Sequence, residues 1–232
     1  FEVLRTSFGF EEGEACQYVH DKAECEFEVV ETVTSLEDAL VEFKRPFVLE
    51  KGGLIRFRII KNFEEKQYML IDIHHIIYDG MSTQVLRNAI ADIYEGKELE
   101  PLALQYKDYA VWQRAYTQSD EIKKQEAYWK EKLSGGNVAK LDLPFEETGI
   151  QQKNAMAATI IETLNAKQKR KVYEISERYG TTSYMILLAA LQVLLYKYTG
   201  QTDITVGSPI AGRKEGLEQQ LGVFINLLVM RN

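Results

Sequence analysis

The sequence has no block of Lys and Arg that would follow a phosphate backbone, and it contains few prolines, cysteines and histidines. Its 28 basic residues are outnumbered by 35 acidic ones, so the net charge is −7 over 232 residues. Because nucleic-acid binding depends on Lys and Arg that neutralise phosphates, this balance disfavours a nucleic-acid partner. Only 4 Pro and 15 Gly accompany a hydrophobic content of 45%, which excludes a disordered or fibrous chain. The composition is that of a globular protein with enough apolar material for a sizeable core.

Long apolar runs are also lacking. The longest, Tyr184–Leu195, is interrupted by a glutamine and falls short of the roughly 20 residues that cross a bilayer, so it predicts a buried helix. No basic segment followed by an apolar one opens the chain, and Cys16 and Cys25 are too few for a disulfide framework. These absences favour a reducing, cytoplasmic setting without a membrane partner. Because the chain begins at Phe1 and stops at Asn232, directly after an apolar run, we expect both ends to be cut from a longer polypeptide.

Periodicity and turn signals predict alternating strands and helices without an internal repeat. The predicted strands are Tyr18–His20, Glu26–Glu31, Leu54–Lys61, Gln67–His75, Ala158–Thr163, Asp203–Val206 and Leu221–Arg231. The predicted helices begin at capping residues Ser35 and Ser82 and cover Tyr106–Leu133. Two more follow, Asn165–Tyr179 ended by Gly180 and Ser183–Tyr198 ended by Gly200. This order predicts an α/β protein made of sheet-plus-helix lobes. The aperiodic stretch up to about Asn154 predicts a linker, which divides the chain into lobes at 1–145 and 146–232.

The clearest chemistry lies in Ile71–Gly80, which reads Ile-Asp-Ile-His-His-Ile-Ile-Tyr-Asp-Gly. If the strand runs through His75, alternation places His74 and His75 on opposite faces, so the two histidines cannot do the same work. A neutral imidazole at a strand end can accept a proton from an amine or hydroxyl near neutral pH. Asp79 lies where the chain turns into a helix, and its carboxylate can orient an imidazole or bind a distant Arg. Gly80 permits a backbone conformation closed to other residues.

This segment resembles the His-His-x-x-x-Asp-Gly hallmark of the condensation domains of non-ribosomal peptide synthetases, in the chloramphenicol acetyltransferase-like superfamily. Three further segments are similar to family motifs in the same order: Glu2–Phe8, Tyr106–Trp112 and Leu221–Leu228. The chain departs from these motifs at Phe1, where the family has His, and at Leu227, where Thr is usual. The resemblance covers the whole chain but about the middle half of the family's domain. It implies the chloramphenicol acetyltransferase-like fold, with one nearly complete lobe and the truncated start of a second.

The resemblance also implies an acyl-transferring enzyme of antibiotic and other secondary metabolism. Family members join an upstream aminoacyl or peptidyl thioester to the amine of a downstream aminoacyl thioester. Both substrates are carried on phosphopantetheine arms of partner carrier domains, beside an adenylation domain, and no metal or tightly held cofactor belongs to the domain itself. A chain of this extent is expected to catalyse poorly or not at all by itself.

Site residues follow from the same resemblance. It assigns the chemistry to His75, which either removes a proton from the amine or positions it and stabilises the tetrahedral intermediate, and it gives His74 a more structural role. It implies a buried ion pair between Asp79 and Arg5, and it places the Gly80 N–H near the developing oxyanion. Asn226 stands in a predicted strand among apolar neighbours, where it lines the substrate tunnel or hydrogen-bonds a neighbouring loop.

Three other interpretations stay open. An epimerization domain shares the motif, but that branch usually continues with Val-Ser-Trp-Arg, whereas this chain continues with Met81-Ser82-Thr83-Gln84. A non-catalytic member that recruits partner proteins typically lacks the second His, and His75 is present. The candidate zinc ligands are Cys16, His20, Cys25, His74 and His75. These match no strong zinc spacing, and adjacent strand histidines point apart.

Two further segments carry weaker signals. Trp112 and Tyr109 stand at helical spacing, which predicts core packing rather than substrate contact. The polar, glycine-bearing segment Ser208–Arg213 predicts a loop at a lobe edge. The motif context around Tyr106 favours a domain that joins two L-configured residues.

Overall fold

The computed structural model describes residues 1–134, 140–144 and 159–232. They form two compact units, one made of Phe1–Ala127 with Pro209–Leu227 and the other of Tyr128–Ser208 with Leu228–Asn232. Most of the predicted linker and the predicted boundary between residues 145 and 146 lie outside the described residues. The division into lobes at 1–145 and 146–232 therefore stays a prediction.

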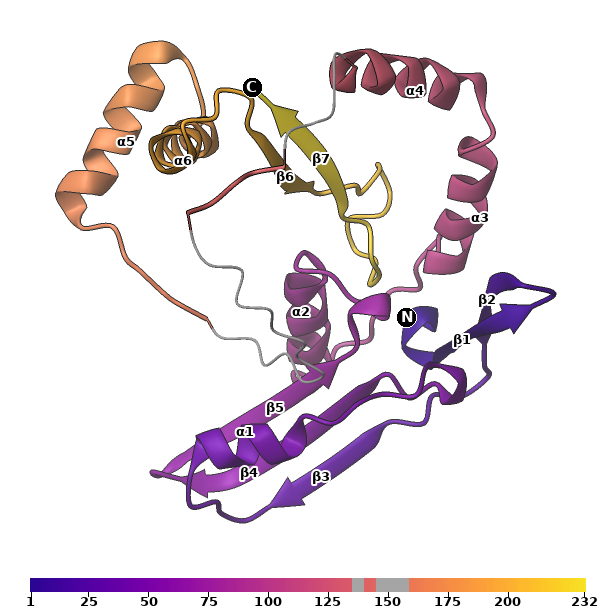
Figure 1. Cartoon of the computed structure of the whole chain (residues 1–232). Coiled ribbons are helices and arrows are strands. Elements are labelled where there is room, and N and C mark those ends of the chain that lie inside the picture. The colour runs from indigo at the N-terminus through magenta and orange to yellow at the C-terminus, as the bar shows by residue number, and fades with distance from the viewer. Residues whose placement is uncertain (135–139, 145–158) are drawn as a thin grey trace. The chain divides into compact units, whose positions relative to one another are not determined.

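The first unit is built on a three-stranded sheet in the order β3–β4–β5 (Figure 1). Strand β3 (Glu26–Val30) lies parallel to β4 (Ile55–Phe63), and β4 pairs antiparallel with β5 (Lys66–Ile73). Helix α1 (Leu36–Phe43) connects the two parallel strands, as a parallel pair requires. The predicted cap is confirmed, since the Ser35 side chain accepts a backbone N–H of the first turn of α1.

A separate hairpin precedes this sheet. Strands β1 (Thr6–Glu11) and β2 (Glu14–Val19) pair antiparallel, and a short 3-10 helix, η1 (Glu2–Arg5), leads into β1. The two turn residues, Glu12 and Gly13, have φ values of 52° and 85°. Two positive φ values match the twist of the flanking strands, which is why this two-residue connection closes the hairpin.

The next three α-helices in the chain come after β5. They are α2 (Ser82–Tyr94), α3 (Tyr106–Tyr116) and α4 (Asp120–Leu133). The single helical region predicted over Tyr106–Leu133 is thus two helices, interrupted at residues 117–119. Helix α3 begins where the Asp108 carboxylate accepts the Gln105 N–H at 2.8 Å, which is one half of a capping box. This bond fixes the start of the aromatic motif that continues along α3.

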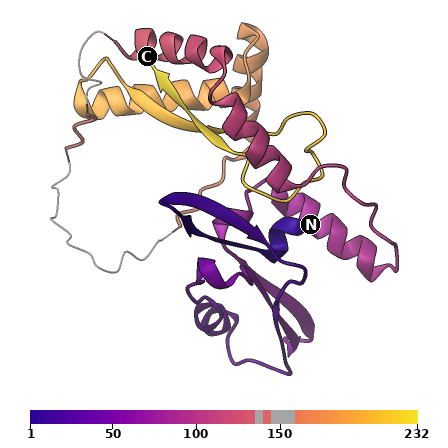
Figure 2. The same cartoon turned by 90° about the vertical axis from the view of Figure 1, so that its right-hand side faces the viewer.

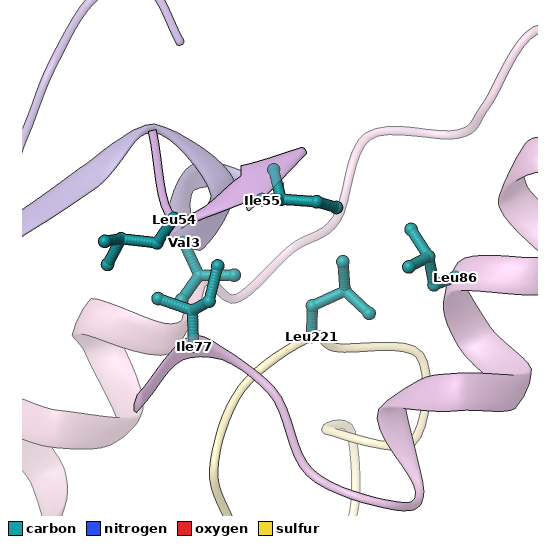
Figure 3. Packing of buried hydrophobic residues seen from close by; sticks show 6 residues of the cluster. All are labelled: Val3, Leu54, Ile55, Ile77, Leu86 and Leu221. Atoms are coloured by element: carbon teal, nitrogen blue, oxygen red, sulfur yellow. The ribbon is translucent and has the colours of Figure 1, made fainter. Parts of the chain in front are cut away.

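The core of the first unit joins segments that are far apart in the sequence. Its buried members are Val3, Leu54, Ile55, Ile77, Leu86 and Leu221, which converge in Figure 3. Ile77 belongs to the histidine motif, and Leu221 precedes β7 (Asn226–Arg231). Burying such a side chain stabilises the fold by about 1.5–3 kcal/mol. The core therefore anchors both the motif turn and the segment before β7.

The second unit contains α5 (Ala166–Tyr179), α6 (Ser183–Thr199) and most of the two-stranded sheet of β6 (Thr205–Ile210) and β7. Helix α6 runs beside this sheet in both views (Figures 1 and 2), and the Tyr184 and Ser208 hydroxyls hydrogen-bond across the contact. Both helices have the predicted ends, since α5 stops at a left-handed Gly180 and α6 at a left-handed Gly200.

Two expectations for this unit need correction. Helix α6 forms as predicted, but it is not buried, because Leu187 and Leu194 are each 50% exposed. The strand predicted at Ala158–Thr163 is wrong: Ala158 lies outside the described residues, and residues 159–163 pair with no strand among those described. Within the part of the chain that the structure describes, no single helix has the length and apolar composition to cross a membrane, and only α5 and α6 together, bent by 105°, reach those limits.

Candidate functional site

The two motif histidines lie in a tight turn at the end of β5. The strand ends at Ile73, and a 3-10 turn, η3 (His75–Ile77), follows. The prediction that the strand runs through His75 is therefore wrong. The cause is local, because the His74 side chain caps the turn: its Nδ1 accepts the Ile76 N–H at 3.0 Å.

His74 and His75 have different surroundings. The His74 ring is half-buried and packs at 88° to the Phe47 ring, with 6.0 Å between the ring centres. The His75 side chain is exposed, and among the described residues it makes no hydrogen bond. A shallow pocket of about 400 Å³ that is widely open to solvent lies beside both rings; this histidine pocket is lined by the segments Lys44–Phe47 and Asp72–His75. His74 is thus engaged in holding the turn, whereas the His75 ring is open to solvent.

Asp79 is the most heavily bonded polar residue of the motif. It is 1% exposed, and its Oδ1 accepts the Ser82 N–H at 2.8 Å and an Arg213 Nη2–H at 3.0 Å. Its Oδ2 accepts the Phe224 N–H at 3.0 Å. The Ser82 hydroxyl lies 2.8 Å from Oδ1. One carboxylate therefore ties the start of α2 to the segment before β7.

The predicted ion pair between Asp79 and Arg5 is wrong. Arg5 lies at the end of η1, where its guanidinium reaches back to the Glu2 carboxylate at 2.9 Å and also bonds the carbonyl of His20. The second oxygen of Glu2 lies 2.6 Å from the Lys107 ammonium. Arg5 consequently holds the N-terminal turn to the end of β2, and Asp79 takes its cation from another segment.

Arg213 is that cation, and the sequence reading missed it by treating Ser208–Arg213 only as an edge loop. Its guanidinium donates to the carbonyls of Leu217 at 2.9 Å and Gln220 at 2.7 Å, and it lies 4.3 Å from the centre of the Phe224 ring. The available signal was a single Arg, directly after a glycine, in the loop that precedes an apolar run. An arginine side chain is long and carries several hydrogen-bond donors, so it can pair with a buried carboxylate and bond neighbouring carbonyls as well.

The pKa of Asp79 is held below its ordinary value. Burial by itself raises the pKa, but the N–H of Phe224, the hydroxyl and N–H of Ser82, and the charge of Arg213 outweigh it. A carboxyl with a lowered folded-state pKa contributes stability above its unfolded pKa of about 3.9, and this contribution is lost as the pH falls through the folded value.

We therefore expect protonation of Asp79 at acidic pH to lower the free energy of unfolding of the wild-type chain. The free energy of unfolding, measured by urea titration from neutral pH down to about pH 3, should fall more steeply in the wild type than in Asp79→Asn, which has no proton to gain there. The variant is expected to be less stable at neutral pH, so the two curves converge on acidification. Parallel curves would show that Asp79 is not held ionised by these bonds.

Ser82 does not cap α2 in the predicted way. It is the first residue of the helix, and its hydroxyl lies 3.0 Å from the carbonyl of Gly222 and accepts an Arg213 Nη2–H at 2.9 Å. The first-turn N–H of Ser82 is satisfied by Asp79 instead. The helix start and the Gly222 segment thereby share one buried polar cluster.

Gly222 is required where this cluster meets α3. Its φ is +154°, and a Cβ built there would lie 2.2 Å from Cδ2 of the Tyr106 ring. We expect Gly222→Ala to destabilise the chain by about 1–3 kcal/mol, because the ring must move. Gly96→Ala is the matched control, since Gly96 also has positive φ (+78°) but nothing within 4 Å of its Cβ position. Equal urea midpoints for the two variants would contradict the steric explanation.

Gly80 and Asn226 differ from their expected descriptions. Gly80 is exposed, has no left-handed φ, and a Cβ on it would meet open space, so the special backbone conformation predicted for it is wrong. Asn226 is exposed and begins β7, and its Oδ1 accepts the Leu227 N–H at 2.8 Å. The strand starts after Phe224, so the expectation of a buried amide is wrong. The oxyanion role of Gly80 and the tunnel-lining role of Asn226 stay predictions.

The aromatic motif on α3 divides into a buried and an exposed part. Tyr109 is 8% exposed, and the Tyr106 hydroxyl donates to the carbonyl of Val223 at 3.0 Å. Burial raises the pKa of Tyr106. Trp112 is 42% exposed and stacks between Tyr109 and Tyr116, so its predicted core position is wrong. The motif packs through its tyrosines.

The described ranges contain no group of three or more His, Cys, Asp and Glu side chains placed to hold a metal ion. The candidate zinc ligands lie in separate settings. Cys16 and Cys25 are free thiols, and the His20 Nε2 lies 2.8 Å from the Ser7 hydroxyl. His74 uses its Nδ1 within its own turn.

The chain resembles known proteins along its whole length. A family model described as "Condensation domain" matches residues 1–232. The chain is 42% identical over 233 residues to bacitracin synthase 2 of Bacillus licheniformis, an alignment that covers 100% of this chain and 9% of that protein. It therefore spans less than a tenth of this curated relative.

Solved structures share the fold. The condensation domain of the monacolin K polyketide synthase MokA has a TM-score of 0.82 at 20% identity, over 99% of this chain and 56% of that one. The epimerization domain from the third module of tyrocidine synthetase B has the same TM-score and identity, with 99% and 56% covered. These likenesses identify the chloramphenicol acetyltransferase-like fold, as expected, and they do not separate the two activities.

Proposed function

Since this chain belongs to the condensation-domain family of non-ribosomal peptide synthetases, we propose that it forms a peptide bond between two carrier-bound thioesters. The donor is an aminoacyl or peptidyl thioester on an upstream carrier domain, and the acceptor is the α-amine of an aminoacyl thioester on a downstream one. Each substrate hangs on its carrier's phosphopantetheine arm. A neighbouring adenylation domain supplies the activated residue, and the partners are therefore other domains of the same synthetase system.

One observation carries this proposal. The His75 ring is exposed beside a pocket of about 400 Å³, while Asp79, four residues later, is 1% exposed and fully bonded. The Asp79 carboxylate cannot serve as the proton acceptor, because it is buried and both of its oxygens already accept hydrogen bonds from the protein. The exposed imidazole has the free ring nitrogen that an amine nucleophile needs.

In the proposed reaction, the acceptor nitrogen attacks the donor thioester carbon, and a tetrahedral intermediate forms. Its collapse makes the amide and expels the donor arm as a thiol, while the amine loses one proton. His75 either takes that proton and returns one to the leaving thiolate or holds the amine in place for attack. The Gly80 N–H is proposed to face the developing oxyanion, and the open space above this glycine leaves room for the intermediate.

Epimerization is the second candidate activity, because an epimerization domain shares the fold and the motif. The residues after the motif, Met81-Ser82-Thr83-Gln84, favour condensation. In the full-length polypeptide with both carriers loaded, we expect the acceptor arm to gain the mass of the donor residue, read by mass spectrometry of the phosphopantetheine arm. An acceptor arm that never gains this mass under single-turnover conditions would contradict the proposal.

A further inference from the structure

Arg56, near the start of β4, is a buried cation that fastens an irregular segment to the sheet. It is 4% exposed, and its Nε lies 3.6 Å from Oδ2 of Asp72, the residue opposite it on β5. Its Nη2 donates to the carbonyl of Arg45 at 3.0 Å, and its guanidinium lies 3.8 Å from the centre of the Phe47 ring. A buried charge is tolerated when it is paired and hydrogen-bonded, so these partners are fixed around it.

The fastened segment forms one wall of the histidine pocket. Residues 44–48 connect α1 to the next short turn and belong to no helix or strand. Pro46 has no N–H to join a strand ladder, so the segment depends on side-chain contacts. Phe47 packs against the hydrophobic core of the first unit, and it also contacts the Arg56 guanidinium and the His74 ring. It therefore links the buried cation to the motif.

The link continues from His74 to His75. The His74 Nδ1 accepts the Ile76 N–H within η3, the turn that begins at His75. Because Nδ1 accepts, the ring proton of the neutral imidazole is on Nε2. A rotation of the His74 ring would break this cap and release the turn. We propose that Arg56 is a positioning residue, which holds Phe47 against His74 and so keeps His75 in place. The inference rests on the function proposed for His75.

Arg58 provides a matched control on the same strand. It is 7% exposed, its Nε lies 2.7 Å from the Glu28 carboxylate, and its guanidinium lies 5.1 Å from the centre of the Phe43 ring. Phe43 belongs to α1, not to the segment beside His74. Replacing either Arg by Met thus removes a buried, paired and ring-stacked cation, but only Arg56→Met releases Phe47.

The first test is spectroscopic and does not depend on activity. The chain has 3 histidines, so nitrogen-15 labelling of their rings gives few signals to assign. We expect the wild-type His74 signals to show a single tautomer with the proton on Nε2. In Arg56→Met these signals should move toward an average of the two tautomers, and in Arg58→Met they should stay. Unchanged His74 signals in Arg56→Met, or equal changes in both variants, would overturn the inference.

The second test measures amide formation in the full-length polypeptide under single-turnover conditions, normalised to the aminoacyl loading of the carriers. We expect Arg56→Met to be slower than Arg58→Met by about tenfold or more, because the histidine is displaced. Arg56→Lys should recover part of the rate, since an ammonium also binds an aromatic face. Equal rates for the two Met variants would argue against positioning. Failure of the wild type to form the amide would sink the proposed function, while the spectra would still decide the role of Arg56.

Discussion

His75→Ala should abolish peptide-bond formation while leaving the fold intact. The His75 side chain is exposed, so its removal leaves no cavity and breaks no bond within the described residues. Proton transfer by a positioned side chain contributes about 10²–10⁴-fold to a rate, and we expect a loss of that size in the single-turnover rate of the full-length polypeptide. The midpoint of urea unfolding should stay within about 0.5 kcal/mol of the wild type.

His20→Ala is the control for this prediction. His20 is also exposed and contacts the Ser7 hydroxyl at the end of the β1–β2 hairpin, away from the motif. It should form the amide at the wild-type rate. Near-normal turnover by His75→Ala would remove the catalytic assignment. A loss of folding in that variant would instead give His75 a structural role.

Arg213→Ala is expected to be the most destabilising single change at the site. The Arg213 and Asp79 side chains are 8% and 0% exposed, and removal of one partner leaves the other charge buried without its match. Breaking such a pair lowers the free energy of unfolding by about 3–5 kcal/mol. The substitution also removes the Arg213 hydrogen bonds to the carbonyls of Leu217 and Gln220. Urea unfolding of the chain should show this loss directly.

Arg5→Ala tests whether the pair is assigned to the correct arginine. The Arg5 side chain is 29% exposed and pairs with Glu2, so its loss should cost about 1 kcal/mol or less. A cost for Arg5→Ala equal to that for Arg213→Ala would contradict the structure. The double variant Asp79→Ala with Arg213→Ala should cost less than the sum of the two single changes, because each single change leaves a buried orphan.

Capping residues and glycines in the sequence predicted the ends of several helices. The cap at Ser35 and the glycine stops at Gly180 and Gly200 predicted helix ends that the structure confirms. Each of these signals acts within one turn of the chain. The bounds predicted for α5 and α6 therefore lie within one residue of the observed ones, whereas the break between α3 and α4 was missed.

The site required information that no local pattern contains. Arg213 lies 134 positions after Asp79 in the chain, and no periodicity connects a loop arginine with a motif carboxylate over that distance. The family resemblance pointed to Arg5, which the structure pairs with Glu2 instead. The sequence predicted that the Asp79 carboxylate pairs with an arginine. Which arginine it pairs with depends on tertiary packing, which the sequence pattern does not contain.

The end of β5 shows how a side chain overrides a strand pattern. The β-rich run was predicted to continue to His75, yet the strand ends at Ile73 because His74 caps the following turn. Trp112 shows that helical spacing alone does not predict burial, since the spacing predicted a core position and the residue is 42% exposed. Periodicity indicates which face a residue occupies, and what covers that face is decided by the rest of the fold.

The most direct test of the central claim is one reaction of the full-length polypeptide in D₂O, analysed by mass spectrometry of both phosphopantetheine arms. Condensation predicts an acceptor arm heavier by the donor residue, an emptied donor arm, and no deuterium on the donor α-carbon. Epimerization must remove and replace the α-proton, so it would place deuterium on that carbon and leave both arms unjoined. Deuterium on the α-carbon without a new amide would contradict the account.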